Sequence, residues 1–383
     1  MVVNTPKVLY RGTVTAPGAT WVAGTISANR SWTSVAYGNG VFVAVASGPT
    51  TGAASSPDAA TWTARTMSSS QDWSGVAYGN GTFVAVSTGS SVAATSPDGI
   101  TWTARTLPSS SQWTSVTYGN GLFVAVSATN GTIAATSPDG ITWTARTLPA
   151  TATWSSVTYG NGLYVAVAST SGTIAASSPD GITWTARTMP STASWGRVVY
   201  GNGTYVATNQ NASSAAASST DGITWTARTL PSASNAWTGL VYGNGTFVAI
   251  LNSSATAATS PDGITWTTRT MPASASYSVV GFGNNTLVAI VSPFATTATS
   301  TVSLYTVPTA TTTIVTNIGA ANISTATSTV TVSLDGFVLL PGTALGVNGQ
   351  TGISLKQVLV AGTAVTATAT LPVGMHVTGV EVT

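Results

Sequence analysis

The sequence contains no cysteine and very few charged or titratable side chains. Its 383 residues include a single histidine, and charged residues make up 5% of the chain, against roughly 25% in an ordinary soluble domain. Disulfides and thiolate metal sites are therefore excluded. The groups that acid–base catalysis needs are scarce, and we expect no cofactor, no metal and no enzymatic activity.

Long apolar runs and clusters of one charge are also missing. The formal net charge is +2, and no basic run marks a nucleic-acid interface. No apolar run approaches the ~20 residues of a membrane helix. The first residues, MVVNTPKVLYRG, lack the apolar core of a signal peptide. We expect no nucleic-acid partner and no membrane insertion.

What the chain has in abundance is one repeated phrase. Tyr-Gly-Asn-Gly recurs every 40 to 42 residues, and Phe282-Gly-Asn-Asn is a degenerate last copy. The full copies begin at Tyr37, Tyr78, Tyr118, Tyr159, Tyr200 and Tyr242. A period of about 40–45 residues is typical of the four-stranded blade of a β-propeller.

Each period contains four strand-like runs, a to d, rich in β-branched and aromatic residues. Tight turns at Gly119-Asn120-Gly121 and Pro138-Asp139-Gly140 separate them, because Asn and Gly tolerate the positive φ of a hairpin turn. No window has the period of an amphipathic helix. In one repeat the predicted strands are Trp113–Tyr118, Leu122–Ser127, Thr132–Ser137 and Ile141–Thr147.

The first and last repeats are incomplete in complementary ways. Thr20–Thr25 is a strand d without its strands a to c, and the final repeat has Tyr277–Phe282, Leu287–Val291 and Ala295–Ser300 but no strand d. We therefore predict an all-β chain with a seven-bladed propeller over residues 18–300. The strand that carries Trp21 would close blade seven and leave few free strand edges.

The two ends of the chain lie outside this ring and predict a second domain. Residues 301–383 contain several strand-like runs separated by turn signals such as Asp335-Gly336 and Asn348-Gly349. Lys7–Val14 is a further run of this kind. We predict that residues 1–17 and 301–383 form one small β-sandwich, into which the propeller is inserted.

Most of the conspicuous side chains recur once per blade, which favours a structural role. An Asp in the c–d turn can accept hydrogen bonds from nearby backbone amides, and the Trp residues would pack between blades. The arginines on strand d could pair with these carboxylates within or between blades. The repeated charged residues are Asp58, Asp98, Asp139, Asp180, Asp221, Asp262, Arg65, Arg105, Arg146, Arg187, Arg228 and Arg269. The charges outside the repeat are Lys7, Arg11, Arg30, Asp72, Arg197, Asp335, Lys356 and Glu381.

The phrase Ser-Pro-Asp-Gly-Ile-Thr-Trp resembles the Asp-box of sialidase-type propellers, although it lacks one residue between Asp and Gly. That motif is structural in the family and implies the fold, not an activity. The catalytic residues do not carry over, since the only glutamate is Glu381 and the only histidine, His376, is also near the C-terminus. A rival hypothesis is a glycoside hydrolase or lyase that depends on Asp72 or a single arginine of the ring.

Variation between blades is concentrated in the b–c loops, such as Asn209–Ser214, and the d–a loops, such as Ser68–Asp72. In a propeller these two sets of loops share one face, which predicts either a binding surface on a rigid scaffold or unconstrained drift. The candidate binding residues are Asp72, Gln112, Asn130, Asn209, Asn211, Asn235 and Asn252.

The predicted small domain is similar to a β module in structural proteins of tailed bacteriophages. Lys7–Val14, Leu304–Ile318 and Val377–Thr383 carry this resemblance. It implies a virion component, for capsid decoration or in the tail or a fibre. Because catalytic groups are scarce, we expect a non-enzymatic structural protein at the virion surface, as a homo-oligomer or in several copies, with capsid or tail proteins as partners. The propeller would then face outward, toward a host-surface glycan. A secreted lectin is a third hypothesis, against which the absence of a signal peptide counts.

Overall fold

The computed structural model describes a chain built of strands. It covers residues 7–15, 18–26, 30–48, 50–291, 300–306, 312–322, 328–334, 337–345, 350–359, 364–369 and 373–382, with side chains for 26, 30–48, 51–272 and 274–291. No helix occurs in these ranges, and so none of them offers a helix able to span a membrane. The chain divides into two compact units, Met1–Pro293 and Phe294–Thr383.

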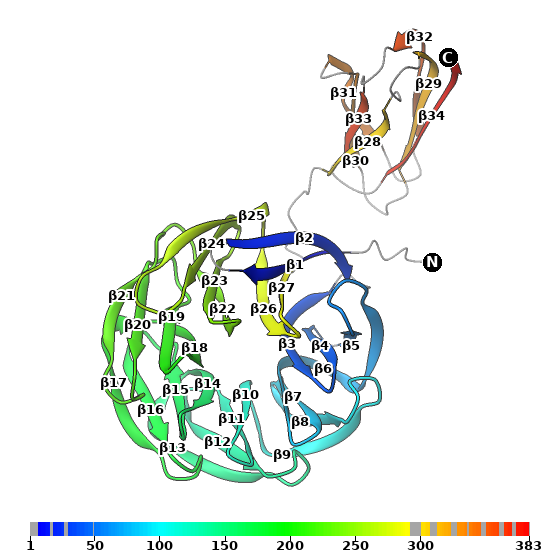
Figure 1. Ribbon diagram of the computed structural model, residues 1–383. Coiled ribbons are helices and arrows are strands. Elements are labelled where there is room, and N and C mark those ends of the chain that lie inside the picture. The colour runs from blue at the N-terminus through cyan, green and yellow to red at the C-terminus, as the bar shows by residue number, and fades with distance from the viewer. Residues whose placement is uncertain are drawn as a thin grey trace. The chain divides into compact units, whose positions relative to one another are not determined.

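The first unit repeats one four-stranded antiparallel sheet, the blade. In the sheet that follows the predicted pattern most closely, strands a to d are β10 (Trp113–Gly119), β11 (Leu122–Ser127), β12 (Gly131–Ser137) and β13 (Thr144–Ala152). The turn from β10 to β11 places Asn120 at φ 44° and Gly121 at φ 77°. Figure 1 shows these sheets arranged as a ring around a central opening, which makes this unit a β-propeller.

Three further sheets have the same order of strands. They consist of β14 (Trp154–Gly160), β15 (Leu163–Ala168), β16 (Gly172–Ser178) and β17 (Thr185–Ala193); β18 (Trp195–Gly201), β19 (Thr204–Asn209), β20 (Ala215–Ser219) and β21 (Thr226–Thr229); and β22 (Trp237–Gly243), β23 (Thr246–Leu251), β24 (Ser254–Ser260) and β25 (Thr267–Ala275).

The first two repeats differ, because they form one seven-stranded sheet from β3 to β9. The long strand β6 (Thr63–Gly79) is strand d of one repeat and strand a of the next. Ser68–Asp72 is therefore part of a strand, where we expected a loop. The register explains this: Gly52 pairs with Thr66 and Thr50 with Gln71, so the connection bulges and returns to the ladder. The other strands of this sheet are β3 (Ser31–Gly38), β4 (Val41–Ser47), β5 (Thr50–Ser56), β7 (Thr82–Thr88), β8 (Ser90–Ser96) and β9 (Thr103–Ser111).

One sheet joins the two ends of the propeller. Its order is β2 (Gly18–Ile26), β1 (Lys7–Thr15), β27 (Thr286–Val291) and β26 (Tyr277–Gly283). The strand that contains Trp21 is outermost, in the position expected for strand d. Its inner neighbour is β1, however, where we expected Ala295–Ser300. Of that segment only Ser300 lies within the described residues, at the start of β28.

This pairing also differs from the prediction that residues 1–17 belong to the small sandwich. The β1 strand pairs with β2 from Lys7↔Ile26 to Thr15↔Gly18, and with β27 from Leu9↔Ile290 to Gly12↔Leu287. Only two residues connect β1 to β2, so closing this hairpin costs far less chain entropy than pairing Lys7–Val14 with strands beyond residue 300.

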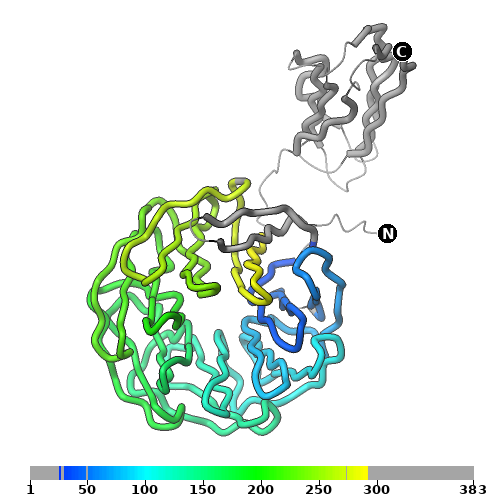
Figure 2. Tube along the Cα trace, in the orientation of Figure 1, coloured from blue at the N-terminus to red at the C-terminus, as the bar shows by residue number. Residues whose placement is uncertain are grey.

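The blades pack on one another through aromatic rings and glycines. The Tyr159 ring lies against Gly119 of the preceding repeat, where an added Cβ would come within 2.0 Å of the ring. The same relation joins the last repeat to the first, since a Cβ on Gly283 would lie 2.1 Å from the Tyr37 ring. Trp113 and Trp154 are fully buried. The chain path in Figure 2 follows this regular stacking from blade to blade.

The second unit has two antiparallel sheets. One has the order β28 (Ser300–Thr306), β33 (Ala364–Ala369), β30 (Ser328–Leu334) and β31 (Phe337–Leu345). The other has the order β32 (Gln350–Leu359), β29 (Thr312–Asn322) and β34 (Val373–Val382). His376 and Glu381 both lie on β34, and Asp335 lies outside the described residues.

Candidate functional site

The aspartates of the repeat hold the c–d turns. Asp139 Oδ1 accepts hydrogen bonds from the amide nitrogens of Ile141 at 2.8 Å and Thr142 at 3.1 Å, and from the Ser137 hydroxyl at 3.0 Å. The Ile141 amide is the largest influence that holds the pKa of this carboxyl below its usual 3.8. Equivalent bonds occur at Asp58, Asp98, Asp180, Asp221 and Asp262.

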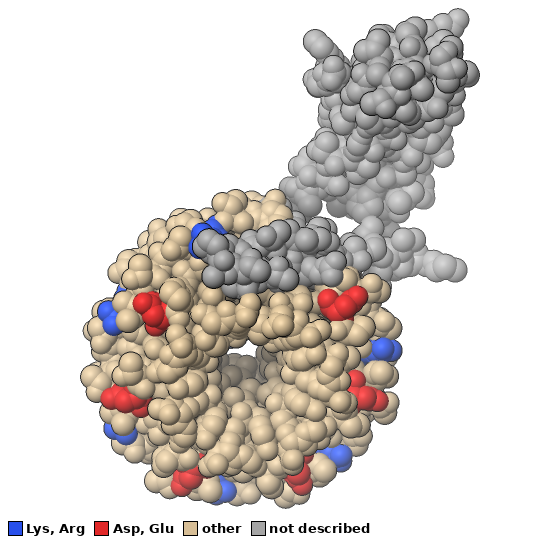
Figure 3. Space-filling view, viewed as in Figure 1, with Lys and Arg blue, Asp and Glu red and all other residues tan. Residues whose placement is uncertain are grey.

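The repeated arginines bind hydroxyl groups on the neighbouring strand. Arg146 Nε donates to Thr136 Oγ1 at 2.9 Å. The same bond is made by Arg65, Arg105, Arg187, Arg228 and Arg269. Acidic and basic side chains are spaced around the outer part of the face shown in Figure 3. Their bonds are local and fix strands c and d, which gives these side chains a structural role in the blade.

The opposite face of the propeller is built from the b–c loops and the d–a connections. These two sets of segments are joined by backbone hydrogen bonds: the Ala128 amide donates to Gln112 O at 2.7 Å, and the Asn252 amide to Ala236 O at 2.8 Å. Similar bonds link Ser169 to Thr153 and Gln210 to Ser194. The segments whose sequences vary from blade to blade therefore share one rigid surface, which we call the loop face.

The structure separates the candidate binding residues by exposure. Gln112, Asn130 and Asn211 are exposed on the loop face. Asn209 is only 6% exposed, and its Oδ1 accepts a hydrogen bond from the Asn211 amide. Asn209 therefore shapes its loop and offers a ligand little exposed surface, whereas the sequence placed it among the binding candidates.

The remaining three candidates are partly buried. Asp72 Oδ1 accepts a hydrogen bond from the Gly48 amide, so this carboxylate ties β6 to the neighbouring b–c loop. Asn235 and Asn252 lie on adjacent segments of another blade. The seven candidates thus lie on one face but spread over several blades, and the structure does not gather them into a single pocket.

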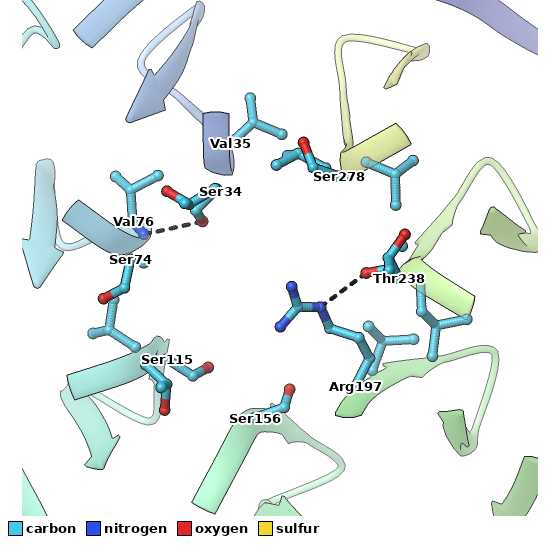
Figure 4. A pocket seen from close by; sticks show the side chains of 18 of the residues that line it. Ser34, Val35, Ser74, Val76, Ser115, Ser156, Arg197, Thr238 and Ser278 are labelled. Carbon is cyan, nitrogen blue, oxygen red and sulfur yellow. Dashed lines mark hydrogen bonds between the residues drawn. The ribbon is translucent and has the colours of Figure 1, made fainter. Parts of the chain in front are cut away.

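A cavity that sequence reasoning did not predict lies at the centre of the ring. Its volume is about 160 Å³, and it is lined by the beginning of strand a of each repeat, on β3, β10, β14, β18, β22 and β26 and at Ser74–Val76 in the second half of β6. The d–a connections lead into these strand starts, which places the cavity toward the loop face. Serine and threonine hydroxyls surround it, and one charged side chain, Arg197, projects into it (Figure 4).

The sequence did carry a signal for this residue. Arg197 occupies the position two residues after the first Trp of its repeat, where Ser34, Ser115 and Ser156 stand in other repeats. It was one of the few charges outside the repeat, but a linear pattern does not show that this position faces the ring's centre. Within the described residues, no cluster of His, Asp or Glu side chains is arranged to hold a metal ion.

Comparisons with known proteins support the fold. No family model matches the chain, and no curated protein sequence matches it. Among solved structures, virginiamycin B lyase from Staphylococcus aureus is similar with a TM-score of 0.62 and 10% identity, over 74% of this chain and 98% of the lyase. YCF48 bound to a D1 peptide gives a TM-score of 0.57 and 14% identity over 74% of this chain and 98% of YCF48.

A third structure, the WD40 β-propeller domain of Doa1, has a TM-score of 0.51 and 9% identity, over 76% of this chain and 98% of that domain. At these identities the likeness shows a β-propeller fold alone. It carries neither the reaction of the lyase nor the peptide of YCF48 to this chain.

Proposed function

We propose that this protein is a non-enzymatic structural component of a tailed-bacteriophage particle. In this proposal the propeller is a closed ring of seven blades with Asp-box-like turns. Residues 301–383 form a small β-sandwich that docks on capsid or tail proteins, and the propeller is displayed at the virion surface in several copies. The support is the resemblance of Leu304–Ile318 and Val377–Thr383 to a phage module, in a unit of two antiparallel sheets.

The pairing of β1 reduces the number of segments that support the phage resemblance in the second unit. Lys7–Val14 was the third segment with the phage resemblance, but it pairs with β27 and β2 in the propeller sheet. The resemblance therefore rests on the segments after residue 300, which belong to the second compact unit.

The loop face is the observation that carries the binding half of the proposal. Its variable segments are locked by backbone hydrogen bonds, so that exposed side chains such as Gln112, Asn130 and Asn211 are presented in fixed positions. Amide side chains both donate and accept hydrogen bonds, which suits the hydroxyl groups of a host-surface glycan. A pre-organised surface of this kind loses little entropy on binding.

The carboxylates favour binding over glycoside hydrolysis. Such hydrolysis needs two carboxyl groups placed across the scissile bond. On the loop face the chain offers Asp72, whose Oδ1 already accepts the Gly48 amide. The repeated aspartates are held in the c–d turns, on the other face. Hydrolase or lyase activity and a secreted lectin remain the alternatives that experiment has to separate.

Binding of the full-length chain to an array of bacterial surface glycans tests the adhesive role. We expect a triple variant, Q112A/N130A/N211A, to lose binding at least about tenfold, since each removes hydrogen bonds of about 0.5–1.5 kcal/mol. The matched control is T101A/T142A/T183A, three exposed side chains on the c–d turns. Turnover of a glycan by the wild type, abolished in D72N, would overturn the non-enzymatic reading.

The proposal that the chain is a component of phage particles is tested separately. Antibodies raised against the full chain should label intact, gradient-purified particles of the phage that encodes it, and the chain should appear among their proteins by mass spectrometry. If the chain is found only outside particles, as a free secreted protein, the virion proposal fails and the lectin alternative replaces it.

A further inference from the structure

The central cavity contains a cation without a matching anion. The Arg197 side chain extends from β18 into the middle of the ring (Figure 4), and its Nε donates to the carbonyl oxygen of Thr238 at 3.2 Å. No described group accepts from its two terminal nitrogens. Enclosure by protein lowers the pKa of Arg197, yet a guanidinium stays protonated in proteins.

The described residues of the propeller unit offer no carboxylate to this cation. Of the seven acidic residues before residue 300, six are the repeated aspartates and the seventh is Asp72. None of them lines the cavity. Arg197 is only partly buried, so its terminal nitrogens remain accessible to an anion that enters the cavity from outside the chain.

Three hydroxyl groups around the cavity are also available as donors. Ser34, Ser115 and Ser156 line it, and each Oγ accepts the backbone amide of the next repeat at 3.1–3.2 Å. No described group accepts their O–H hydrogens. A hydroxyl whose oxygen accepts one bond can rotate its hydrogen toward another acceptor. Serine donors and guanidinium N–H groups therefore converge on the same space.

The blade that carries Arg197 departs from the other repeats at several neighbouring positions. At the position of Gly196, all six other repeats have a Ser or Thr. Its hydroxyl donates a hydrogen bond to a backbone carbonyl oxygen of the adjacent repeat, and in the last repeat this residue is Ser278. Opposite Arg197 in the ladder, Thr208 replaces the Val or Ile of the other repeats. Thr208 is fully buried and its hydroxyl has no hydrogen-bond partner. These three departures, at residues 196, 197 and 208, lie together in one blade, next to the cavity.

We propose that this cavity is a binding site for a small carboxylate, anchored by the terminal nitrogens of Arg197 and by serine hydroxyls. The planar guanidinium fork matches a carboxylate with two parallel hydrogen bonds. A cavity of about 150 Å³ is large enough for a molecule of the size of benzene, so a volume of about 160 Å³ admits a ligand of a few heavy atoms. The aliphatic side chains of Val76, Val116 and Leu240 also line the cavity and would contact the ligand's hydrocarbon part.

Calorimetric titration of the full chain at constant ionic strength tests this site. The probes are acetate, its neutral isostere acetamide, sulfate, and triglycine, which carries a carboxylate at the end of a chain. We expect acetate or triglycine to bind one to one and acetamide not to bind. Binding of acetate but not of triglycine would indicate that the ligand is a free small acid. Binding of triglycine would indicate the carboxylate terminus of a polymer that enters from the loop face. Sulfate binding as tight as that of both carboxylates would contradict the preference for a planar anion.

The variant R197S restores the residue that three other repeats have at this position, so it should fold. We expect it to lose carboxylate affinity at least about tenfold, the range of a hydrogen bond to a charged group, and R197K to bind more weakly than the wild type. The matched control R146S removes one positive charge from an outer strand and should bind like the wild type. Equal binding by R197S, or no binding of any carboxylate by the wild type, would overturn the proposal. The site and the glycan-binding proposal use different residues, so either can fail alone.

Discussion

The Ser278 hydroxyl donates a hydrogen bond of 2.9 Å to the carbonyl oxygen of Trp32, which lies 246 residues earlier in the chain. Within the ring, Ser155 makes the same bond to the carbonyl oxygen of Trp195 at 2.6 Å. The junction between the last and the first repeat therefore uses the same hydroxyl-to-carbonyl contact as the junctions between consecutive repeats.

This equivalence predicts that the seam is as strong as an internal junction. We expect S278A and S155A to lower the free energy of unfolding by similar amounts, about 0.5–1.5 kcal/mol each, in urea denaturation followed by tryptophan fluorescence. The control S171A removes an exposed hydroxyl and should have little effect. If S155A lowers the free energy of unfolding and S278A does not, the junction between the last and the first repeat is open in solution.

Two glycines of one hairpin should respond differently to alanine. A Cβ on Gly119 would lie 2.0 Å from the Tyr159 ring, whereas a Cβ on Gly121 meets nothing within 4 Å but is strained at φ 77°. We expect G119A to cost about 3 kcal/mol or more, because the aromatic ring between two blades must move. G121A should cost about 1–2 kcal/mol. Thermal unfolding measures the stability lost in each variant. An equal loss in both, or a larger loss in G121A, would show that the aromatic rings do not pack as described.

The turn aspartates predict how stability depends on pH. Bonds from the backbone, led by the amides of Thr101, Thr183 and Thr224 respectively, hold the pKa of Asp98, Asp180 and Asp221 below 3.8. A carboxyl whose pKa is lower in the folded state stabilises the fold above its unfolded pKa, and this contribution disappears as the pH falls through the folded pKa. We therefore expect the free energy of unfolding to decrease between about pH 5 and pH 1.

The variant D98N/D180N/D221N isolates this effect. Asn keeps an oxygen that accepts the turn amides but has no charge to titrate. Its unfolding free energy should be lower than that of the wild type at neutral pH and should change less on acidification. Parallel curves for the two proteins, from urea denaturation across this pH range, would contradict the assignment.

The repeat made much of the propeller predictable. The spacing of Tyr37, Tyr78 and their later copies, with Asn-Gly turns between β-branched runs, gave the four-stranded unit and its order, since these features are local in sequence. The outer position of the strand with Trp21 followed from a missing strand d in the last repeat. The strand that pairs with Lys7–Val14 could not be predicted, because the sequence of a strand does not show which exposed sheet edge it joins.

The candidate sites were less predictable for a related reason. Exposure on the loop face could be inferred for Gln112 and Asn130 from the loops they occupy. The burial of Asn209 could not, since Asn fixes turns as readily as it binds ligands. Arg197 was visible as an irregular charge, but its place in the central cavity depends on strands from all the repeats, and no local sequence pattern shows which residues meet there.

The closing sheet also sets an order in time. During synthesis β1 and β2 leave the ribosome well before β27, the strand with which β1 pairs. At about 5–20 residues per second, the hairpin waits on the order of tens of seconds with one edge unpaired. A chain that stops before β27 has no partner for this edge of β1, so the sheet that joins the two ends of the propeller forms only after residue 291 has been made.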